Sequence, residues 1–142
     1  MTRINVLEPS ELYDQHLLIE LRELPRLFTY IEQHMLLNPV YRGPETYTLG
    51  KGHVKFFSNK ALYLYKRMFA LHHESLLRNF NFKFDSDNWN SRYNSIPSIL
   101  KQDYFPTLNA IDINRERIFE KVILRPNFYR YCGKLIDQKI DF

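Results

Sequence analysis

The most constraining feature of the sequence is a predicted amphipathic helix near the N-terminus that contains a proline. Six apolar residues recur there at intervals of three or four, the period of an α-helix with one buried face: Leu17, Leu21, Leu24, Phe28, Ile31 and Met35. Pro25 falls inside this run, where a proline removes one backbone hydrogen bond and bends the helix. Ser10 is the expected N-cap, and Asn38-Pro39 should end the helix because the residue before a proline avoids the α region.

Two further helices are predicted along the chain. One begins after Asn59, which is its expected N-cap. Its predicted inward face consists of Leu62, Tyr65, Phe69, His72 and Leu76. The other runs from about Ala110 to the residue before Pro126. Its apolar residues are Ile111, Ile118, Phe119 and Val122.

The segments between these helices are predicted to be loops. Residues 39–58 contain two prolines and three glycines, with a partly extended element at "TLGKGHVKFF". Residues 79–106 are polar and tyrosine-rich, with short turns and little periodicity. We therefore expect an all-α fold: one compact domain over residues 1–142, with three main helices and long ordered loops.

Composition favours a soluble protein of the cell interior. Apolar residues make up 44% of the 142, enough to build a core. The one cysteine, Cys132, excludes an internal disulfide and fits a reducing compartment. The N-terminus lacks the apolar segment of a signal peptide, and no apolar run approaches the roughly 20 residues of a membrane span. We expect a cytoplasmic, non-secreted protein with no membrane partner.

The positive charge of the chain is concentrated near its C-terminal end. Six basic and two acidic residues lie between Arg115 and Lys134, a difference of +4 that equals the net charge of the whole chain. Arg117, Lys121 and Arg125 are spaced as one basic stripe, expected on the outer side of the last helix. Such a segment is typical of a protein that binds a polyanion, although charge alone fits a solvated surface equally well.

Several other motifs have residue types that can support chemistry. His16, Glu20 and Glu23 have a spacing that could hold a transition metal, but no second ligand cluster accompanies them, so a solvated helical flank is favoured and no metal is expected. "LGKGHV" lacks the residues of a P-loop or a dinucleotide fingerprint, which excludes nucleotide hydrolysis. Cys132 lies among aromatic residues and is expected to be a buried, inert thiol. His72 and His73 are expected to be structural.

The segment "NFYRYCGK" interleaves aromatic and basic side chains: Phe128, Tyr129, Arg130, Tyr131 and Lys134. Aromatic faces stack on unpaired bases while cations hold phosphates, so the segment suits an opened or distorted nucleic acid. The alternative is a C-terminal segment packed into the core.

The N-terminus offers a nucleophile. Thr2 is small, so Met1 is expected to be removed, leaving a threonine α-amine. With a pKa of about 7.7–8.0, an α-amine is neutral far more often near pH 7.4 than a lysine with a pKa of about 10.4. It can therefore attack an electrophilic carbon without being buried.

Four blocks of sequence together resemble the phage-type pyrimidine-dimer DNA glycosylase, or endonuclease V, family. They are "MTRIN", the pattern ELxDQHLxxExRELPR over residues 11–26, "LGKGHVKFF" and "RPNFYRYCGK". The resemblance covers nearly the whole chain and is weakest over residues 79–100. It implies an all-α protein that needs no metal or organic cofactor. Its expected partner is double-stranded DNA containing pyrimidine dimers or abasic sites, bound by a monomer.

The resemblance also implies roles for particular residues. The α-amine of Thr2 would attack the sugar of the 5′ nucleoside of a cyclobutane dimer, and β-elimination would then cut the strand. Glu23 would be the catalytic acid, and a base opposite the lesion would be flipped out of the stack. The implied DNA-binding residues are Arg3, Gln15, His16, Arg22, Arg26, Arg117, Lys121, Arg125, Tyr129, Arg130 and Tyr131.

The sequence departs from the family pattern at a few positions. Glu32 and Gln33 stand where the phage pattern has basic residues, which predicts weaker non-specific DNA binding. Phe128 and Cys132 stand where the family's tail can carry tryptophan and tyrosine. Two alternatives stay open: a glycosylase of the same mechanism for another base lesion, and a catalytically inactive helical DNA-binding module.

Overall fold

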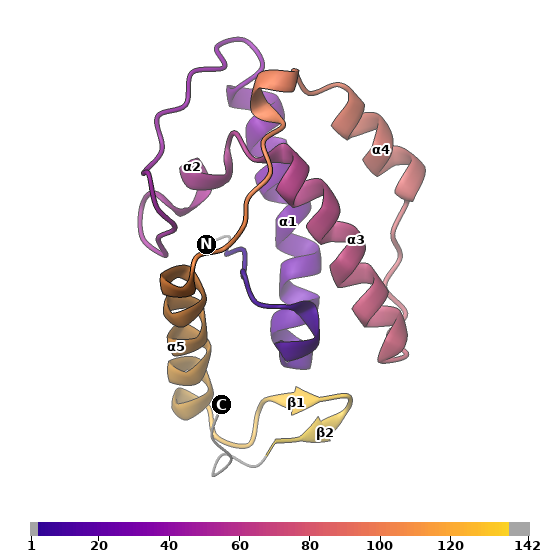
Figure 1. The fold of residues 1–142 in the computed structure, drawn as a ribbon. Helices are drawn as coiled ribbons and strands as arrows, with labels where there is room; N and C mark the ends of the chain where they lie inside the picture. The colour runs from indigo at the N-terminus through magenta and orange to yellow at the C-terminus, as the bar shows by residue number, and fades with distance from the viewer. Residues whose placement is uncertain (1–2, 137–142) are drawn as a thin grey trace.

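The computed structural model describes residues 3–136 (Figure 1). Its order of elements is η1 (Pro9–Glu11), α1 (Asp14–His34), α2 (His53–Phe57), α3 (Ala61–Leu77), α4 (Ser86–Asn94), η2 (Ser98–Leu100), α5 (Leu108–Leu124), β1 (Arg130–Tyr131) and β2 (Lys134–Leu135). The predicted all-α class is confirmed, because helices dominate and the two short strands form a single antiparallel pair. The three longest helices, α1, α3 and α5, are the three that the sequence predicts.

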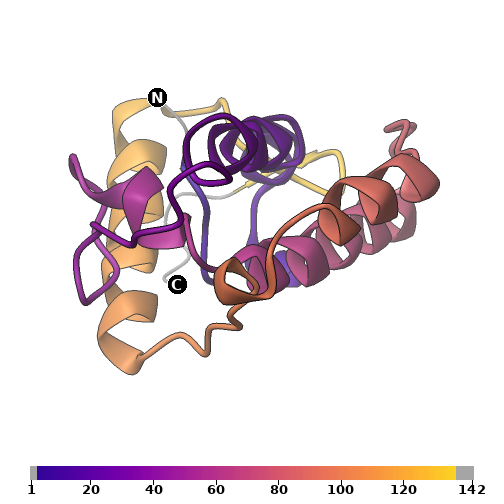
Figure 2. The same cartoon turned by 90° about the horizontal axis from the view of Figure 1, so that it is seen from above.

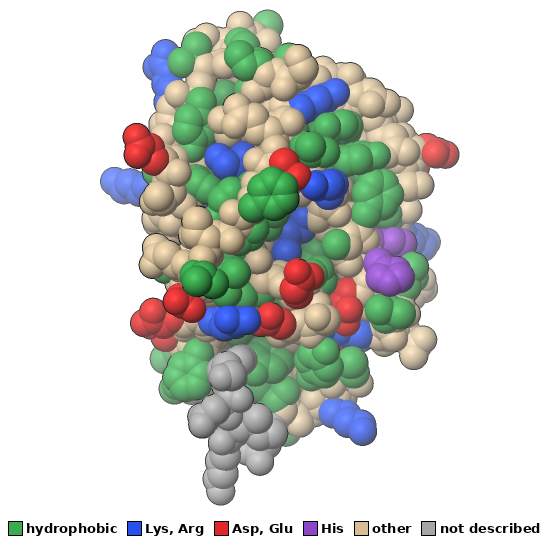
Figure 3. All heavy atoms as spheres, in the orientation of Figure 1, with side chains coloured by type: hydrophobic (Ala, Val, Ile, Leu, Met, Phe, Trp, Pro, Cys, Tyr) green, Lys and Arg blue, Asp and Glu red, His purple; other side chains and the backbone are tan. Residues whose placement is uncertain are grey.

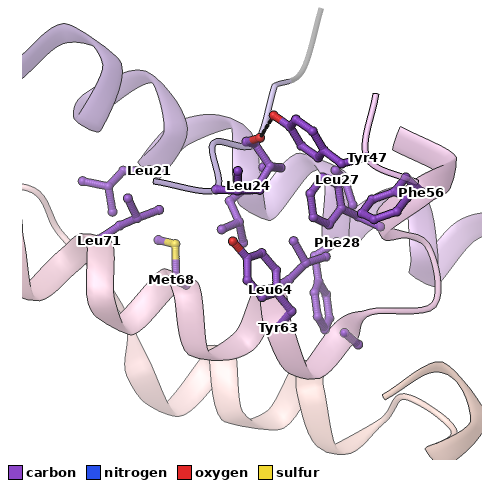
Figure 4. Packing of buried hydrophobic residues seen from close by; sticks show 14 of the residues in the cluster. Leu21, Leu24, Leu27, Phe28, Tyr47, Phe56, Tyr63, Leu64, Met68 and Leu71 are labelled. Carbon is purple, nitrogen blue, oxygen red and sulfur yellow. Dashed lines mark hydrogen bonds between the residues drawn. The ribbon is translucent and has the colours of Figure 1, made fainter. Parts of the chain in front are cut away.

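The core lies between α1 and α3, which lie next to each other in Figure 1; Figure 2 looks nearly along the axis of α1. All six residues of the predicted stripe on α1 are buried, as expected. From α3, Leu64, Met68 and Leu71 pack against them, each at most 2% exposed (Figure 4). Burying such a side chain fully stabilises the fold by about 1.5–3 kcal/mol, so this seam fixes how the two helices sit.

The predicted inward face of α3 is wrong. Leu76 is 54% exposed, and the other four residues of that face are only half-buried. Both sides of α3 carry large apolar residues, and the predicted side faces α4 and the segment before it. There Tyr65 stacks on Tyr93 at 4.2 Å, and Phe69 meets Phe84 at 5.3 Å. Periodicity alone could not tell which side meets α1.

The ends of α1 differ from the prediction. Ser10 lies in the turn η1 and does not cap the helix, which begins at Asp14 with Tyr13 in the N-cap position. The helix ends at His34, before Asn38-Pro39. Pro25 lies inside it, as the sequence requires. Likewise, the N-cap position of α3 is Lys60 and not Asn59.

Two short helices occupy segments that the sequence predicts as loops. The "GHVKFF" segment forms α2 and is not extended. In the second segment Asp85 caps α4 by accepting a hydrogen bond from the Asn88 amide at 3.0 Å. Trp89 is the buried residue of α4 and packs on Phe28 of α1 at 4.7 Å. One buried anchor gives no periodic signal, which explains why this helix was missed.

The chain then forms α5 and a hairpin. Thr107 caps α5 through the Ala110 amide at 3.1 Å. In the hairpin, Arg130 pairs with Leu135 and Tyr131 with Lys134. The two turn residues, Cys132 and Gly133, both have positive φ, of 50° and 82°, as in the tight turns that suit hairpins. Cys132 is therefore exposed at the turn, and the prediction of a buried thiol is wrong.

In the described part of the chain, no helix has the length and apolarity that crossing a membrane demands.

Candidate functional site

A cavity of about 260 Å³ lies where α1, α5, the N-terminal segment and Tyr129 meet. It is lined by Arg3, Asn5, His16, Ile19, Glu20, Arg117, Lys121, Arg125 and Tyr129. Six of these are residues that the sequence analysis assigns to DNA binding, and they come from opposite ends of the chain. The cavity therefore brings together predicted residues that are more than a hundred positions apart in the sequence.

The predicted basic stripe of α5 lines this cavity. Lys121 and Arg125 are exposed, as expected for the outer side of the helix, whereas Arg117 is half-buried. The buried row of α5 consists of Ala110, Asn114, Ile118 and Val122. Arg117, Lys121 and Arg125 each lie next to this row, which turns them toward α1. The outer residues of α5 include Asp112, Glu116 and Glu120, all exposed.

The cavity has an excess of positive charge. Arg3, Arg117, Lys121 and Arg125 line it, and the lining carboxylate of Glu20 is already paired with Arg67. Burial lowers the pKa of Arg117, and the nearby charge of Arg3 lowers it further. Burial also lowers the pKa of Arg3. Arg3 and Arg117 are partly buried cations, which gain most from a bound anion, so the cavity suits a phosphate group.

His16 is a neutral imidazole on the wall of this cavity. Burial lowers its pKa to about 4, with further contributions from Arg117 and Lys121. Its ring stacks on Tyr129, with centroids 4.7 Å apart and planes 6° from parallel. Within residues 3–136 its Nδ1 atom is buried without a hydrogen-bond partner. A buried polar atom without a partner costs about 1–3 kcal/mol.

Glu20 is a structural carboxylate and does not lie on a solvated flank. It is fully buried, and Arg67 Nε donates to its Oε2 at 2.5 Å while Asn5 Nδ2 donates to its Oε1 at 2.9 Å. His16 is buried as well, so the predicted solvated flank is wrong for both residues. In the described part of the chain, no three His, Cys, Asp or Glu side chains are grouped as metal ligands.

Buried side chains hold residues 4–7 by their peptide groups. Ile4 N–H donates to His53 Nε2 at 2.7 Å, and the Tyr47 hydroxyl donates to Ile4 O at 2.9 Å. Figure 4 shows this tyrosine bond above the α1–α3 core. Val6 N–H donates to Asn114 Oδ1 at 2.6 Å. The segment that leads to the N-terminus is thus fixed by α2, α5 and the loop between α1 and α2.

Two further bonds hold the same segment. We call the side chains that hold residues 4–7, namely Tyr47, His53, Arg67 and Asn114, the clamp. Asn114 Nδ2 donates to Asn5 Oδ1 at 2.7 Å, and Arg67 Nη1 donates to Leu7 O at 2.7 Å. The sequence analysis missed the role of His53, Asn114 and Arg67. Only His53 carried a signal, because it lies in the "LGKGHVKFF" block; polar residues on otherwise apolar helical faces would have been the clue for the other two.

Glu23 lies on α1 one helical turn beyond Glu20, on the same side of the helix. It pairs with Arg26 at 3.1 Å, and its side chain is 20% exposed against 71% for Arg26. Neither Glu23, Arg22 nor Arg26 lines the cavity. Thr2, the predicted nucleophile, lies outside the described residues.

The predicted residues of the tail divide into two groups. Tyr129 lines the cavity, whereas Tyr131 donates its hydroxyl to Ser10 O at 2.6 Å and lies over the Arg78 guanidinium at 4.4 Å. The Arg130 side chain is exposed and donates to Gly133 O at 3.1 Å. Phe128 is half-buried, with the Arg125 guanidinium 3.6 Å from its ring centroid.

Two side chains at the start of α1 hold this tail in place. Gln15 donates to Phe128 O at 2.7 Å and accepts from Arg130 N–H at 3.0 Å, so both ends of its amide bind backbone. Asp14 accepts from the amides of Cys132 and Gly133 at 2.9 and 2.7 Å. The beginning of α1 thereby anchors the hairpin, and the hairpin places Tyr129 on His16.

A comparison with family models finds one that matches residues 1–88, described as pyrimidine dimer DNA glycosylase. The matched part contains the N-terminal segment, α1, α2 and α3. It therefore includes the clamp residues His53 and Arg67. Arg117, Lys121, Arg125 and Tyr129, which form the other wall of the cavity, lie beyond it. Because the match covers more than half of the chain, this protein belongs to the pyrimidine dimer DNA glycosylase family and has the function of a DNA-repair glycosylase that acts on pyrimidine dimers.

Proposed function

We propose that this glycosylase uses the α-amine of Thr2 as its nucleophile. The amine attacks C1′ of the 5′ nucleoside of a cyclobutane pyrimidine dimer, and the glycosidic bond breaks with its electron pair going to the base. The sugar ring opens, and the amine and C1′ become a protonated imine. Loss of a proton from C2′ then breaks the bond between C3′ and its oxygen, which cuts the strand. The protein is therefore also an abasic-site lyase.

The observation that carries this proposal is the clamp on residues 4–7. A nucleophile at the end of a chain needs its approach fixed, because held geometry lowers the barrier for attack. Buried bonds from His53, Tyr47 and Asn114 fix the peptide groups that follow Arg3, and Arg3 lines the cation-rich cavity.

Glu23 assists this chemistry in our proposal. Its carboxylate stabilises the cationic imine and sugar and helps to move the proton. It lies between Arg22 and Arg26 on α1. Two cations that bind phosphates are therefore adjacent to an anion that stabilises a developing positive charge.

The substrate in this proposal is double-stranded DNA with a pyrimidine dimer or an abasic site, bound by a monomer wherever genomic or viral DNA is. Arg3, Arg117, Lys121 and Arg125 hold phosphates in the cavity, and Arg22 and Arg26 hold the strand beside it. A nucleotide drawn out of the duplex enters this cavity beside His16 and Tyr129, whose stacked rings form part of its wall.

The test is to trap the imine. The protein is mixed with a duplex that carries one defined cyclobutane dimer, borohydride is added, and any adduct is mapped by mass spectrometry. An adduct on the Thr2 α-amine, absent with undamaged DNA, is the expected result. An adduct formed only on a pre-formed abasic site would keep the amine chemistry and move the search to another lesion. No adduct on either DNA, with Met1 absent, would overturn the proposal.

A further inference from the structure

A second cation-lined cavity, also of about 260 Å³, lies at the C-terminal end of α1. Its lining residues are Tyr30, His34, Met35, Asn38, Val40, Arg42, Lys55 and Ser58. None of them is acidic, and they offer hydroxyl, amide, imidazole, guanidinium and ammonium groups. Within residues 3–136, neither Arg42 nor Lys55 is engaged in an ion pair, and both are exposed. This is the donor set that a phosphate group requires.

Arg42 and Lys55 line the same cavity from a loop and from α2, which pack against each other. Gly43 packs so tightly on α2 that a Cβ atom there would lie 2.6 Å from Lys55 O. The Tyr41 hydroxyl donates to Pro44 O at 2.5 Å, which closes the loop around Gly43. The backbone of the loop next to Arg42 is therefore packed against α2, which carries Lys55.

Both cavities lie on the same side of α1. His16 and Ile19 line the first and Tyr30 and His34 line the second, with Glu23 and Arg26 between them at steps of three and four. At 1.5 Å per residue, His34 lies about 16 Å along the helix from Glu23. One strand of a duplex carries a phosphate about every 3.4 Å along its axis, so this length corresponds to roughly five phosphates.

We propose that this second cavity binds a backbone phosphate of the DNA substrate, roughly five nucleotides from the reacting one. This inference rests on the proposed function. Glu32 pairs with Arg92 of α4 at 2.6 Å and contributes no cation, so Arg42 and Lys55 hold the substrate at this end of α1.

The experiment compares two double variants that lose the same charge. Arg42→Gln/Lys55→Gln removes the cations of the second cavity, and Lys66→Gln/Arg115→Gln removes two cations that pair with Asp103 and Glu11 elsewhere. Binding to a long duplex with one central dimer is measured over a range of salt concentrations. We expect the cavity variant to bind about threefold to tenfold more weakly, with the slope of log K against log salt lower by about 1. We expect the control variant to match the wild type.

Truncated substrates locate the contact. Shortening the duplex to roughly 3 base pairs on one side of the dimer should abolish the difference between wild type and cavity variant, and shortening the other side should preserve it. Single-turnover cleavage at saturating protein should be unchanged. Gly43→Ala keeps both charges but pushes the loop from α2, and it should reproduce the weaker, less salt-dependent binding while circular dichroism stays unchanged.

Three outcomes would overturn the inference. Equal binding by the two double variants would show that the second cavity does not bind DNA. A loss of affinity that does not depend on duplex length would show a general effect of charge. If inorganic phosphate stabilises the wild type but not the cavity variant while DNA binding is equal, the site serves a free anion. A wild type that forms no trapped adduct would instead refute the proposed function, so the two failures are distinguishable.

Discussion

His53 and His16 make the stability of this protein depend on pH in the acid range. Burial is the main cause that lowers the pKa of each from 6.5 to about 4. Because the unfolded chain binds more protons between these values, stability is fully present above pH 6.5 and is lost as pH falls toward about 4. The loss should be on the order of 3 kcal/mol for each histidine.

Urea unfolding at several pH values tests this expectation. The His53→Gln variant no longer titrates at that position, so its free energy of unfolding should fall by roughly half as much as that of the wild type over the same range. Equal pH dependence of the two proteins would show that His53 is not held neutral.

Glu20 and Glu23 are two acids one turn apart on α1 with opposite expected roles. Glu20→Gln leaves the buried Arg67 guanidinium without its counter-ion, which should destabilise the fold by about 3–5 kcal/mol. Glu23→Gln changes a partly exposed pair with Arg26 and should cost less than about 1 kcal/mol. Borohydride trapping and strand cleavage should nevertheless fall by orders of magnitude in Glu23→Gln. A Glu23→Gln protein that cleaves at the wild-type rate would contradict the catalytic role.

At the scale of elements, the hairpin controls the environment of His16. Asp14 accepts the two amides of the hairpin turn, and Tyr129 covers the His16 ring. Asp14→Ala should release the hairpin and let water reach the imidazole, which raises the pKa of His16 from about 4 toward 6.5. A nuclear magnetic resonance titration of His16 measures this directly, and Tyr129→Ala should give the same rise. A pKa that stays near 4 in both variants would mean that the charges of Arg117 and Lys121 hold it low.

The elements also show what the sequence could predict. The stripe on α1 could be predicted because its six residues share one side of the helix and all of them are buried. The side of α3 that meets α1 could not be predicted, because α1 covers one side of this helix and α4 the other, and both sides are apolar. Six of the nine cavity residues were named through the family resemblance, whereas the clamp depends on Asn114 and Arg67, whose partners lie about 60 to 110 positions away. Such pairings have no local signature.

At the scale of the whole molecule, the positions of the positive charges are more informative than the net charge. The net charge is only +4, and the face formed by α3 and the segment after η2 mixes acidic, basic and apolar side chains (Figure 3). The cavity between α1 and α5, in contrast, gathers four cations around the paired Glu20. If DNA binds at the cavity, the salt dependence of binding should follow which cations are removed.

Arg117→Gln/Lys121→Gln provides the test, because it lowers the net charge by the same two units as Lys66→Gln/Arg115→Gln on other surfaces. Each phosphate contact contributes about 0.9 to the slope of log K against log salt, so the cavity variant should lose roughly 1.8 from the wild-type slope and the other variant close to nothing. Fluorescence anisotropy with undamaged and dimer-containing duplexes over a range of salt gives both slopes. If the slope fell equally in the two variants, overall charge would govern binding, and the cavity would not be the site that binds the DNA backbone. A loss confined to the cavity variant on both duplexes would mean that the same cations hold the strand before and after the lesion is found.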